Sequence, residues 1–329
     1  MSALLEARGV TKHFPLSRGR IVHAVDDVSL AIEKKEIVGL VGESGSGKST
    51  FGKILVGLYS RSAGEVRFAG ELLPQRYTPA DFRRYASRIQ MIFQDPYSSL
   101  NPRMTVGEII GEGLHLRGGS NGADVASAVR DWLARVGLEA GHASRYPHEF
   151  SGGQRQRVGI ARALIMQPEF VVCDEPISAL DVSVQAQIVR LLGELKASLG
   201  LTMLFIAHDL SMVRYISDRM AVMYLGSLVE IGTADDVYFR PKHPYTQILV
   251  ASNPQADPRG ERQRATIPIK GEIASAVNVR AGCRFAKRCP KVMDVCRSVT
   301  PQLRAVADGA SERRVACHLY DPAHDGRAA

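Results

Sequence analysis

The sequence lacks any run of apolar residues long enough to cross a membrane. No stretch of 18 or more consecutive apolar residues occurs among the 329, although 45% of them are apolar, which is enough for a large core. The first residues, MSALLEARGVTKHF, mix charged and apolar side chains and so lack the apolar segment of a secretory signal. We therefore expect the chain to stay in the cytoplasm, either free or docked on a membrane protein.

Concentrated basic charge is also missing. The net charge is +8, but the basic residues are spread along the chain apart from short groups at 259–264 and 313–314. Nucleic-acid-binding domains usually gather their basic residues on one face or stripe. The distribution therefore favours a generally basic surface, and we expect no nucleic acid partner. The length allows two domains, or one large domain with an appendage.

Cysteine is nearly absent from the first 280 residues, where only Cys173 occurs, in an apolar run typical of a strand core. The other four follow a segment rich in proline, arginine and glycine. Disulfides are rare in the cytoplasm, and gaps of five, six and twenty residues are longer than those of common zinc-binding pairs. The residues alone leave free thiols, a zinc site and an iron–sulfur cluster open for Cys283, Cys289, Cys296 and Cys317.

The most informative stretch that is present is GLVGESGSGKST, at residues 39–50. It fits G-x-x-x-x-G-K-[ST], in which backbone amides surround a polyphosphate, the lysine reaches the β- and γ-phosphates and the hydroxyl binds Mg²⁺. An apolar, β-branched run precedes it and a helical pattern follows, so the phosphates would meet a helix N-terminus. The stretch predicts a nucleotide site.

Polar residues follow three further strand-like runs. Gln94 ends RIQMIFQ, Asp174 and Glu175 end FVVCDE, and His208 follows TMLFIA. Ligands of open α/β sheets bind at the carboxyl ends of the strands, which makes these residues candidates for catalysis. Amphipathic helical patterns fill residues 104–150, and Ser151 is a good N-cap for the arginine-rich helix that comes next.

The order of these motifs resembles the ATP-binding subunits of ABC transporters: phosphate loop, glutamine loop, SGGQ signature, D-E strand tip, S-A-L-D loop and switch histidine. The resemblance covers roughly residues 1–250. QDPYSSLNPRMTV, CDEPISALDVSVQAQI and GCRFAKRCP are similar to the dipeptide and oligopeptide permease ATPases. Two departures, Phe150 before the signature and EKKE at 33–36 without its usual glycine, do not put activity in doubt.

The resemblance implies a role for each site residue. Glu175 would orient and deprotonate the attacking water, His208 would contact the γ-phosphate, and Gln94 would touch Mg²⁺ together with Ser49 and Asp174. The signature would complete the site of an opposite subunit. The nucleotide contacts that the resemblance implies are Phe14, Gly42, Glu43, Ser44, Gly45, Ser46, Gly47, Lys48, Ser49, Thr50, Asp174, Ser151, Gly152, Gly153, Gln154 and Asp181.

The resemblance also implies the architecture. We expect an α/β P-loop ABC ATPase core with an antiparallel β-subdomain and a helical subdomain, plus a small cysteine-bearing C-terminal module. The nucleotide-binding domain would span 1–252 with a helical insert at about 95–165, and the module would span 253–329. Its four cysteines would hold a [4Fe–4S] cluster, with zinc as the alternative. Because the module is remote in sequence from the ATP motifs, we expect it to serve structure or redox sensing.

The implied function is ATP-driven import of peptides, by closure of a head-to-tail ATPase dimer. The partners would be a second ATPase subunit, identical or paralogous, two membrane permease subunits and, indirectly, an extracytoplasmic peptide-binding protein. The chain would lie on the cytoplasmic face of the cytoplasmic membrane, with Leu100 in a groove for a permease helix. Alternatives are import of nickel or glutathione, or a soluble ABC ATPase of DNA repair or translation. The single phosphate loop and the lack of a heptad array disfavour the soluble class.

Overall fold

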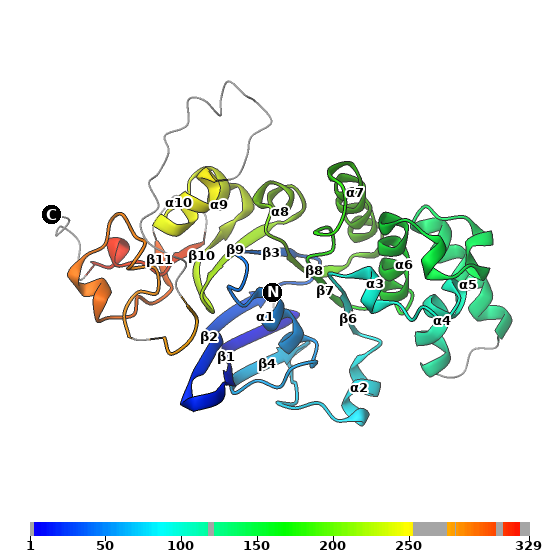
Figure 1. The fold of residues 1–329 in the computed structure, drawn as a ribbon, viewed down its shortest axis with the longest axis horizontal. Helices are drawn as coiled ribbons and strands as arrows, with labels where there is room; N and C mark the ends of the chain where they lie inside the picture. The colour runs from blue at the N-terminus through cyan, green and yellow to red at the C-terminus, as the bar shows by residue number, and fades with distance from the viewer. Residues whose placement is uncertain (1–2, 118–121, 253–274, 280, 307–311, 323–329) are drawn as a thin grey trace, which may run out of the picture.

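A computed structural model of the chain describes residues 3–117, 122–252, 275–279, 281–306 and 312–322. These residues form two β-sheets, helices around them and an arm of helices at one end (Figure 1). The C-terminal segment lies at the opposite end, beside β10.

The larger sheet has eight strands in the order β11-β12-β10-β9-β3-β8-β7-β6. The five strands from β9 to the edge strand β6 run parallel, whereas β10, β12 and β11 pair antiparallel. Every residue of β3, β7 and β8 is buried, as apolar runs covered on both faces require. The strands are β3 (Ile37–Val41), β6 (Ile89–Ile92), β7 (Phe170–Asp174), β8 (Thr202–Ile206), β9 (Arg219–Tyr224), β10 (Ser227–Thr233), β11 (Arg304–Val306) and β12 (Arg313–Val315).

The smaller sheet is antiparallel, in the order β2-β1-β4-β5. Its apolar face and the larger sheet enclose α1 (Lys48–Leu55), whose Phe51, Ile54 and Leu55 belong to the shared core. The helix that follows the phosphate loop is thus held between two sheets. The strands are β1 (Leu5–Pro15), β2 (Ile21–Ile32), β4 (Ala63–Phe68) and β5 (Glu71–Leu72).

The helical arm consists of α3 (Pro96–Ser99), α4 (Val106–Arg117), α5 (Gly122–Arg135) and α6 (Gly152–Leu164). Ser151 Oγ accepts a hydrogen bond from the Gln154 amide, and Gln154 Oε1 accepts one from the Ser151 amide, so the SGGQ sequence itself sets the start of α6. The remaining helices are α2 (Pro79–Tyr85), α7 (Val182–Leu199), α8 (Leu210–Ile216), α9 (Ala234–Phe239) and α10 (Pro244–Ala251).

The C-terminal segment extends the larger sheet instead of standing apart from it. Strand β12 pairs with β10 through Glu230↔Val315 and Ile231↔Arg314. The Arg313 guanidinium forms an ion pair with Glu230, and both side chains are fully buried. Removing one partner of a buried pair leaves an uncompensated charge, so this pair ties the segment to the sheet. The domain limits at residues 252 and 253 stay predictions.

Candidate nucleotide site

The loop between β3 and α1 lies directly against strand β2. Gly47 has a φ of 102°, and a Cβ there would lie 2.0 Å from the carbonyl oxygen of Ala24 on β2. Only glycine permits this approach. Gly47 is also the N-cap of α1. Because glycine has no side chain that could cap the helix, the amides of the first turn are available to an anion.

Lys48 is held inside this loop. Its side chain is 4% exposed, and Nζ donates hydrogen bonds to the carbonyl oxygens of Gly42 at 2.8 Å and Glu43 at 3.0 Å. Burial lowers the pKa of Lys48, although the charges of Glu175 and Asp174 oppose this shift. The ammonium group of Lys48 is therefore already shielded from water. Phosphate oxygens would replace the loop carbonyls as its hydrogen-bond acceptors.

Ser49 and Asp174 meet beside the loop. Ser49 Oγ donates a hydrogen bond to Asp174 Oδ1 at 2.6 Å, across 125 residues of sequence. Burial raises the pKa of Asp174, and the hydrogen bond from Ser49 opposes this shift. A hydroxyl and a carboxylate form the kind of oxygen pair that Mg²⁺ prefers.

Three of the predicted residues converge at the carboxyl ends of neighbouring parallel strands. Gln94 follows β6, Glu175 follows β7 and His208 follows β8. Glu175 Oε2 accepts a hydrogen bond from Gln94 Nε2 at 3.0 Å and lies 3.7 Å from His208 Nδ1. Glu175 has a φ of 43°, and such left-handed strain in a non-glycine residue concentrates at functional sites.

A cavity of about 30 Å³ adjoins these residues, lined by Glu175, Ser178, Gln185 and His208 among others. A volume of roughly 10–15 Å³ suffices for one water molecule. The site therefore has room for a water molecule next to the Glu175 carboxylate.

The signature glycines pack against α7 and the turn that precedes it. A Cβ at Gly153 would lie 2.6 Å from Val184 of α7, and one at Gly152 would lie 3.4 Å from Leu180. Asp181 is exposed as the N-cap of α7. These residues thus belong to a surface at the base of the helical arm.

Phe14 lies near the end of β1 and is half-buried. Its ring meets the edge of Tyr59 with centroids 5.7 Å apart, and Lys12 Nζ lies 5.0 Å from its centroid. The loop tip, Ser44 and Gly45, is exposed, whereas Ser46 is buried.

One expectation is corrected by the structure. Leu100 is 3% exposed and belongs to the core of the helical arm, so it does not line an open groove. Its neighbour Tyr97 is 64% exposed instead. The C-terminal segment, remote in sequence, contacts the phosphate loop through Arg288, which pairs with Glu43.

Two contacts to Glu43 are not predicted by the motifs. Besides the ion pair with Arg288, its amide donates a hydrogen bond to Tyr245 Oη at 2.8 Å. The one available signal was the pair of arginines between the cysteines of CRFAKRC, which we interpreted only through the cysteines.

Comparisons with known protein families cover both halves of the chain. Residues 25–178 match the family model described as ABC transporter, and residues 229–296 match the oligopeptide/dipeptide transporter C-terminal region. The putative oligopeptide transport ATP-binding protein YkfD of Bacillus subtilis is 52% identical, over 96% of this chain and 95% of that protein. The oligopeptide transport ATP-binding protein AppF of the same organism is 46% identical, over 96% and 97%. A putative peptide import ATP-binding protein of Brucella ovis is 48% identical, over 93% and 95%.

Solved structures resemble the cassette. The ATP-binding cassette MJ0796, a dimer bound to ADP and Pi in a post-hydrolysis state, has a TM-score of 0.65 and 29% identity, over 70% of this chain and 98% of that one. The protein cbiO1 of Clostridium perfringens, part of the ABC transporter complex cbiONQ, has a TM-score of 0.64 and 26% identity, over 73% and 92%.

None of the helices in the described ranges combines the length and the apolar character needed to span a bilayer.

The predicted fold class, an α/β P-loop ABC ATPase core, is confirmed by the sheet order and by these solved structures. ATP is the nucleotide of such cassettes. The relatives are named as ATP-binding proteins, and the match to them covers nearly their whole length. The chain therefore belongs to the ABC transporter family, as an ATP-hydrolysing protein of its oligopeptide and dipeptide transporter group.

Proposed function

We propose that ATP hydrolysis by this chain drives the import of di- and oligopeptides through a membrane permease. The observation that carries this proposal is the double match, of the cassette to ABC transporters and of residues 229–296 to the oligopeptide/dipeptide transporter region. Relatives whose names specify peptide transport also match over nearly their full length. This favours peptides over nickel, glutathione and a soluble repair or translation role.

Different residues around the loop would bind the phosphates of ATP and the Mg²⁺ ion. Lys48 would leave the carbonyls of Gly42 and Glu43 and donate to the β- and γ-phosphates, as the first amides of α1 do. The oxygens of Ser49 and Asp174, with Gln94, would hold Mg²⁺. When bound, the ion compensates the charge that develops on the phosphates.

Glu175 is the proposed general base. Its carboxylate borders the water-sized cavity, and the amide of Gln94 fixes its orientation from one side. His208, whose side chain is mostly exposed, lies near the same carboxylate and would contact the γ-phosphate. Phosphoryl transfer needs positioning and charge compensation above all, which side chains at rigid strand ends provide.

A second ATPase subunit, identical or paralogous, would complete the site. The turn at Ser151–Gln154, which is exposed at Ser151 and half-buried beyond it, and the exposed N-cap Asp181 would face the phosphates bound by the opposite subunit, as two chains meet head to tail. Phe14 would stack on adenine, since aromatic faces bind bases without hydrogen-bond readout. ATP would close this dimer and hydrolysis would reopen it.

We further propose that two permease subunits receive the motion and that an extracytoplasmic peptide-binding protein delivers the solute. The chain would then lie on the cytoplasmic face of the cytoplasmic membrane as a peripheral subunit. We propose no nucleic acid partner.

The function is tested by reconstituting the chain with its permease and binding protein in proteoliposomes. Uptake of a labelled tripeptide should require ATP on the side of this chain and should stop with Glu175→Gln. Uptake of nickel or glutathione in place of every peptide tested would reject the peptide assignment. ATP hydrolysis that no solute stimulates would reject the transport role.

Tyr97 offers a sharper probe of coupling than Leu100. It is exposed on α3, three residues after Gln94, and the Arg155 guanidinium lies 3.7 Å from its ring centroid. Arg155 belongs to the helix that begins at the signature, so Tyr97 connects this helix to the surface. Aromatic anchors dominate binding interfaces. We expect Tyr97→Ser to reduce peptide uptake about tenfold while detergent-solubilised ATPase activity is retained.

The control for this prediction is Tyr215→Ser, which removes an equally exposed tyrosine from α8. It should leave uptake intact. Wild-type uptake by the Tyr97→Ser transporter would show that this surface does not receive the permease.

The four C-terminal thiols share one neighbourhood. The amide of Cys283 donates a hydrogen bond to the carbonyl oxygen of Cys296 at 2.8 Å. Burial raises the pKa of Cys317 to about 12, and its three fellow cysteines add to this rise. Gly282 allows the close turn, because a Cβ there would lie 2.8 Å from the Cys296 carbonyl oxygen. The arrangement gathers four sulfurs, as a metal centre requires.

Their spacing argues against a single zinc ion. Zinc–sulfur bonds of about 2.3 Å in a tetrahedron place sulfurs roughly 3.8 Å apart. Within the described residues, the one group of three possible ligands with donor atoms within 4.8 Å of one another is His13, His23 and Asp26. Each thiolate of a [4Fe–4S] cluster binds a different iron, so its sulfurs lie further apart. We therefore propose the cluster.

Anaerobically purified protein should be brown and contain about four irons per chain. Cys289→Ser should lose this iron, whereas Cys173→Ala, in the core of β7, should keep it. Stoichiometric zinc without iron would replace the cluster by a zinc site. Four titratable thiols in folded, metal-free protein would reject a metal centre.

A further inference from the structure

Residues 283–289 of the C-terminal segment lie against the phosphate loop. The segment carries Arg284, Phe285 and Arg288, and each of the three begins a chain of contacts that ends at the loop. Cysteine chemistry does not require these contacts, and they involve residues outside the proposed cluster.

The most direct contact joins Arg288 to Glu43, the residue that follows Gly42, the opening glycine of the loop. The two terminal nitrogens of Arg288 lie 2.9 and 3.1 Å from the two carboxylate oxygens of Glu43. The Arg288 side chain is only 6% exposed, whereas that of Glu43 is 28% exposed. This two-pronged geometry is the strongest form of ion pair between these groups, and burial protects it from solvent screening.

An aromatic contact supports the same loop residue. Phe285 is buried, and its ring centroid lies 5.3 Å from that of Tyr224 and 5.5 Å from that of Tyr245. Tyr245 Oη in turn accepts the hydrogen bond from the amide of Glu43. The segment therefore fixes both the backbone and the side chain of Glu43.

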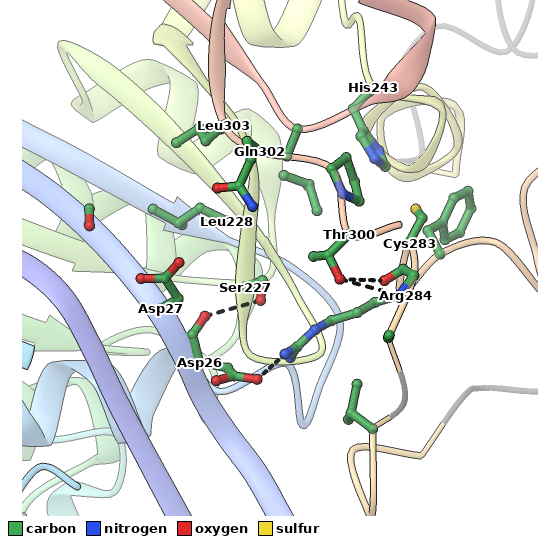
Figure 2. A pocket seen from close by; sticks show the side chains of 18 of the residues that line it. Asp26, Asp27, Ser227, Leu228, His243, Cys283, Arg284, Thr300, Gln302 and Leu303 are labelled. Carbon is green, nitrogen blue, oxygen red and sulfur yellow. Dashed lines mark hydrogen bonds and ion pairs between the residues drawn. The ribbon is translucent and has the colours of Figure 1, made fainter. Parts of the chain in front are cut away.

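Arg284 makes the third connection. It donates hydrogen bonds to the Asp26 carboxylate on β2 and to the Leu225 carbonyl in the β9–β10 turn. The next residue of this turn, Gly226, donates its amide hydrogen to the carbonyl oxygen of Ser46 at 2.8 Å. Figure 2 shows Arg284 reaching Asp26 along a cavity of about 460 Å³ between β2, β10 and the C-terminal segment.

A carboxylate in the phosphate loop works against ATP binding. Lys48 Nζ, the group that would bind the phosphates, donates a hydrogen bond to the backbone carbonyl of Glu43 at 3.0 Å. The charge of the Glu43 side chain also opposes the lowering of the Lys48 pKa by burial, so this carboxylate acts on the region that would hold the polyphosphate. Like charges in such a region repel, most strongly where water is excluded. Arg288 removes this repulsion by neutralising Glu43 and fixing its direction.

We propose that Arg288 is a positioning residue of the nucleotide site, which neutralises Glu43 and keeps this carboxylate off the bound polyphosphate. The C-terminal segment is thereby part of the ATP site and not an appendage to it. This inference rests on the proposed phosphate-binding role of the loop.

The test measures the KM for ATP and the kcat of hydrolysis in the full-length transporter. Arg288→Gln should raise the KM for ATP about tenfold, the effect of one uncompensated nearby charge, with little change in kcat because Glu175 and His208 are untouched. If the segment only stabilised the fold, Arg288→Gln would lower the melting temperature of the protein. The KM for ATP would then stay unchanged at temperatures well below the melting temperature.

The double variant separates charge from packing. Glu43→Gln removes the carboxylate, so adding it to Arg288→Gln should restore most of the lost affinity. If the double variant is as weak as Arg288→Gln alone, the charge argument is wrong and the proposal falls. Arg288→Lys keeps the positive charge and should raise the KM less than Arg288→Gln does.

Arg297→Gln is the matched control, because Arg297 lies in the same segment with a side chain 72% exposed. It should leave the KM unchanged. If Arg288→Gln does not fold, hydrogen exchange in the wild-type transporter decides: Mg²⁺ and ATP should slow exchange at residues 283–289, and an unchanged rate would contradict the proposal. Lys48→Ala tests the phosphate-binding role of the loop separately. If Lys48→Ala loses ATP binding while Arg288→Gln keeps the wild-type KM, the loop is the phosphate site and only the positioning role of Arg288 is rejected.

Discussion

Replacing Glu175 with glutamine is expected to reduce steady-state ATP hydrolysis by about 10³-fold, within the range that general-base catalysis contributes. Glutamine keeps the shape of the side chain and can still contact Gln94, but it cannot accept the proton of the attacking water. Because Lys48 and Ser49 remain, ATP affinity should change little. ATP should therefore hold the dimer closed, and the closed dimer should accumulate.

Phosphate release measures the loss of turnover, and size-exclusion chromatography with ATP measures the accumulated dimer. Glu169→Gln is the matched control, because Glu169 precedes the same strand at its opposite end and is partly exposed in a pair with Arg88. It should behave as the wild type. Normal turnover in Glu175→Gln would assign the base to another group.

Lys48→Ala is expected to weaken ATP binding about 100-fold, equivalent to roughly 3 kcal/mol, which is the upper range for a charged hydrogen-bonding group. Lys48 is buried and its hydrogen-bond acceptors are carbonyls of the loop itself. Alanine removes the main cation that faces the β- and γ-phosphates, and it also removes the group that spans the loop. Binding, rather than only turnover, should therefore be lost.

Titration with a fluorescent ATP analogue measures this affinity. Lys34→Ala provides the control, because it removes an exposed lysine from the turn before β3. It should bind the analogue like the wild type. Unchanged affinity in Lys48→Ala would mean that the glycine-rich loop is not the phosphate site.

The phosphate loop and the strand ends could be predicted from sequence because their chemistry depends on local patterns. A buried strand followed at once by a polar residue gave Gln94, Glu175 and His208 separately, and the parallel sheet order then placed them side by side. Parallel strands end at one edge of a sheet, so three local signals became one site.

The burial of Leu100 could not be predicted in this way. SSLNP follows a loop and carries a proline, so its sequence is compatible with an exposed turn. Its side chain nonetheless belongs to one core with residues of α4, α5 and α6, which follow it in the chain. Burial of a single apolar residue in a loop depends on what packs over it, and no local pattern records that.

Lys35 shows a related limit. It occupies the position in EKKE where the family resemblance leads one to expect glycine, and its φ is 64°. Its amide donates a hydrogen bond to Thr202 Oγ1 at 2.9 Å, so the turn keeps its shape at a cost of roughly 1–2 kcal/mol for a left-handed lysine. The turn precedes β3, whereas the phosphate loop follows this strand, so the two lie at opposite ends of it.

The sequence by itself determined the nucleotide-binding loop, the strand-end residues, the start of the signature helix and the family resemblance. Each is encoded within a few residues, where spacing alone fixes backbone geometry. Only the tertiary structure decided that Arg288 pairs with Glu43, 245 residues away, and that β12 completes the larger sheet. Pairing across such distances is set by how the sheets stack and by which buried charges find partners. The arginines of CRFAKRC are visible in the sequence, but their partners are not.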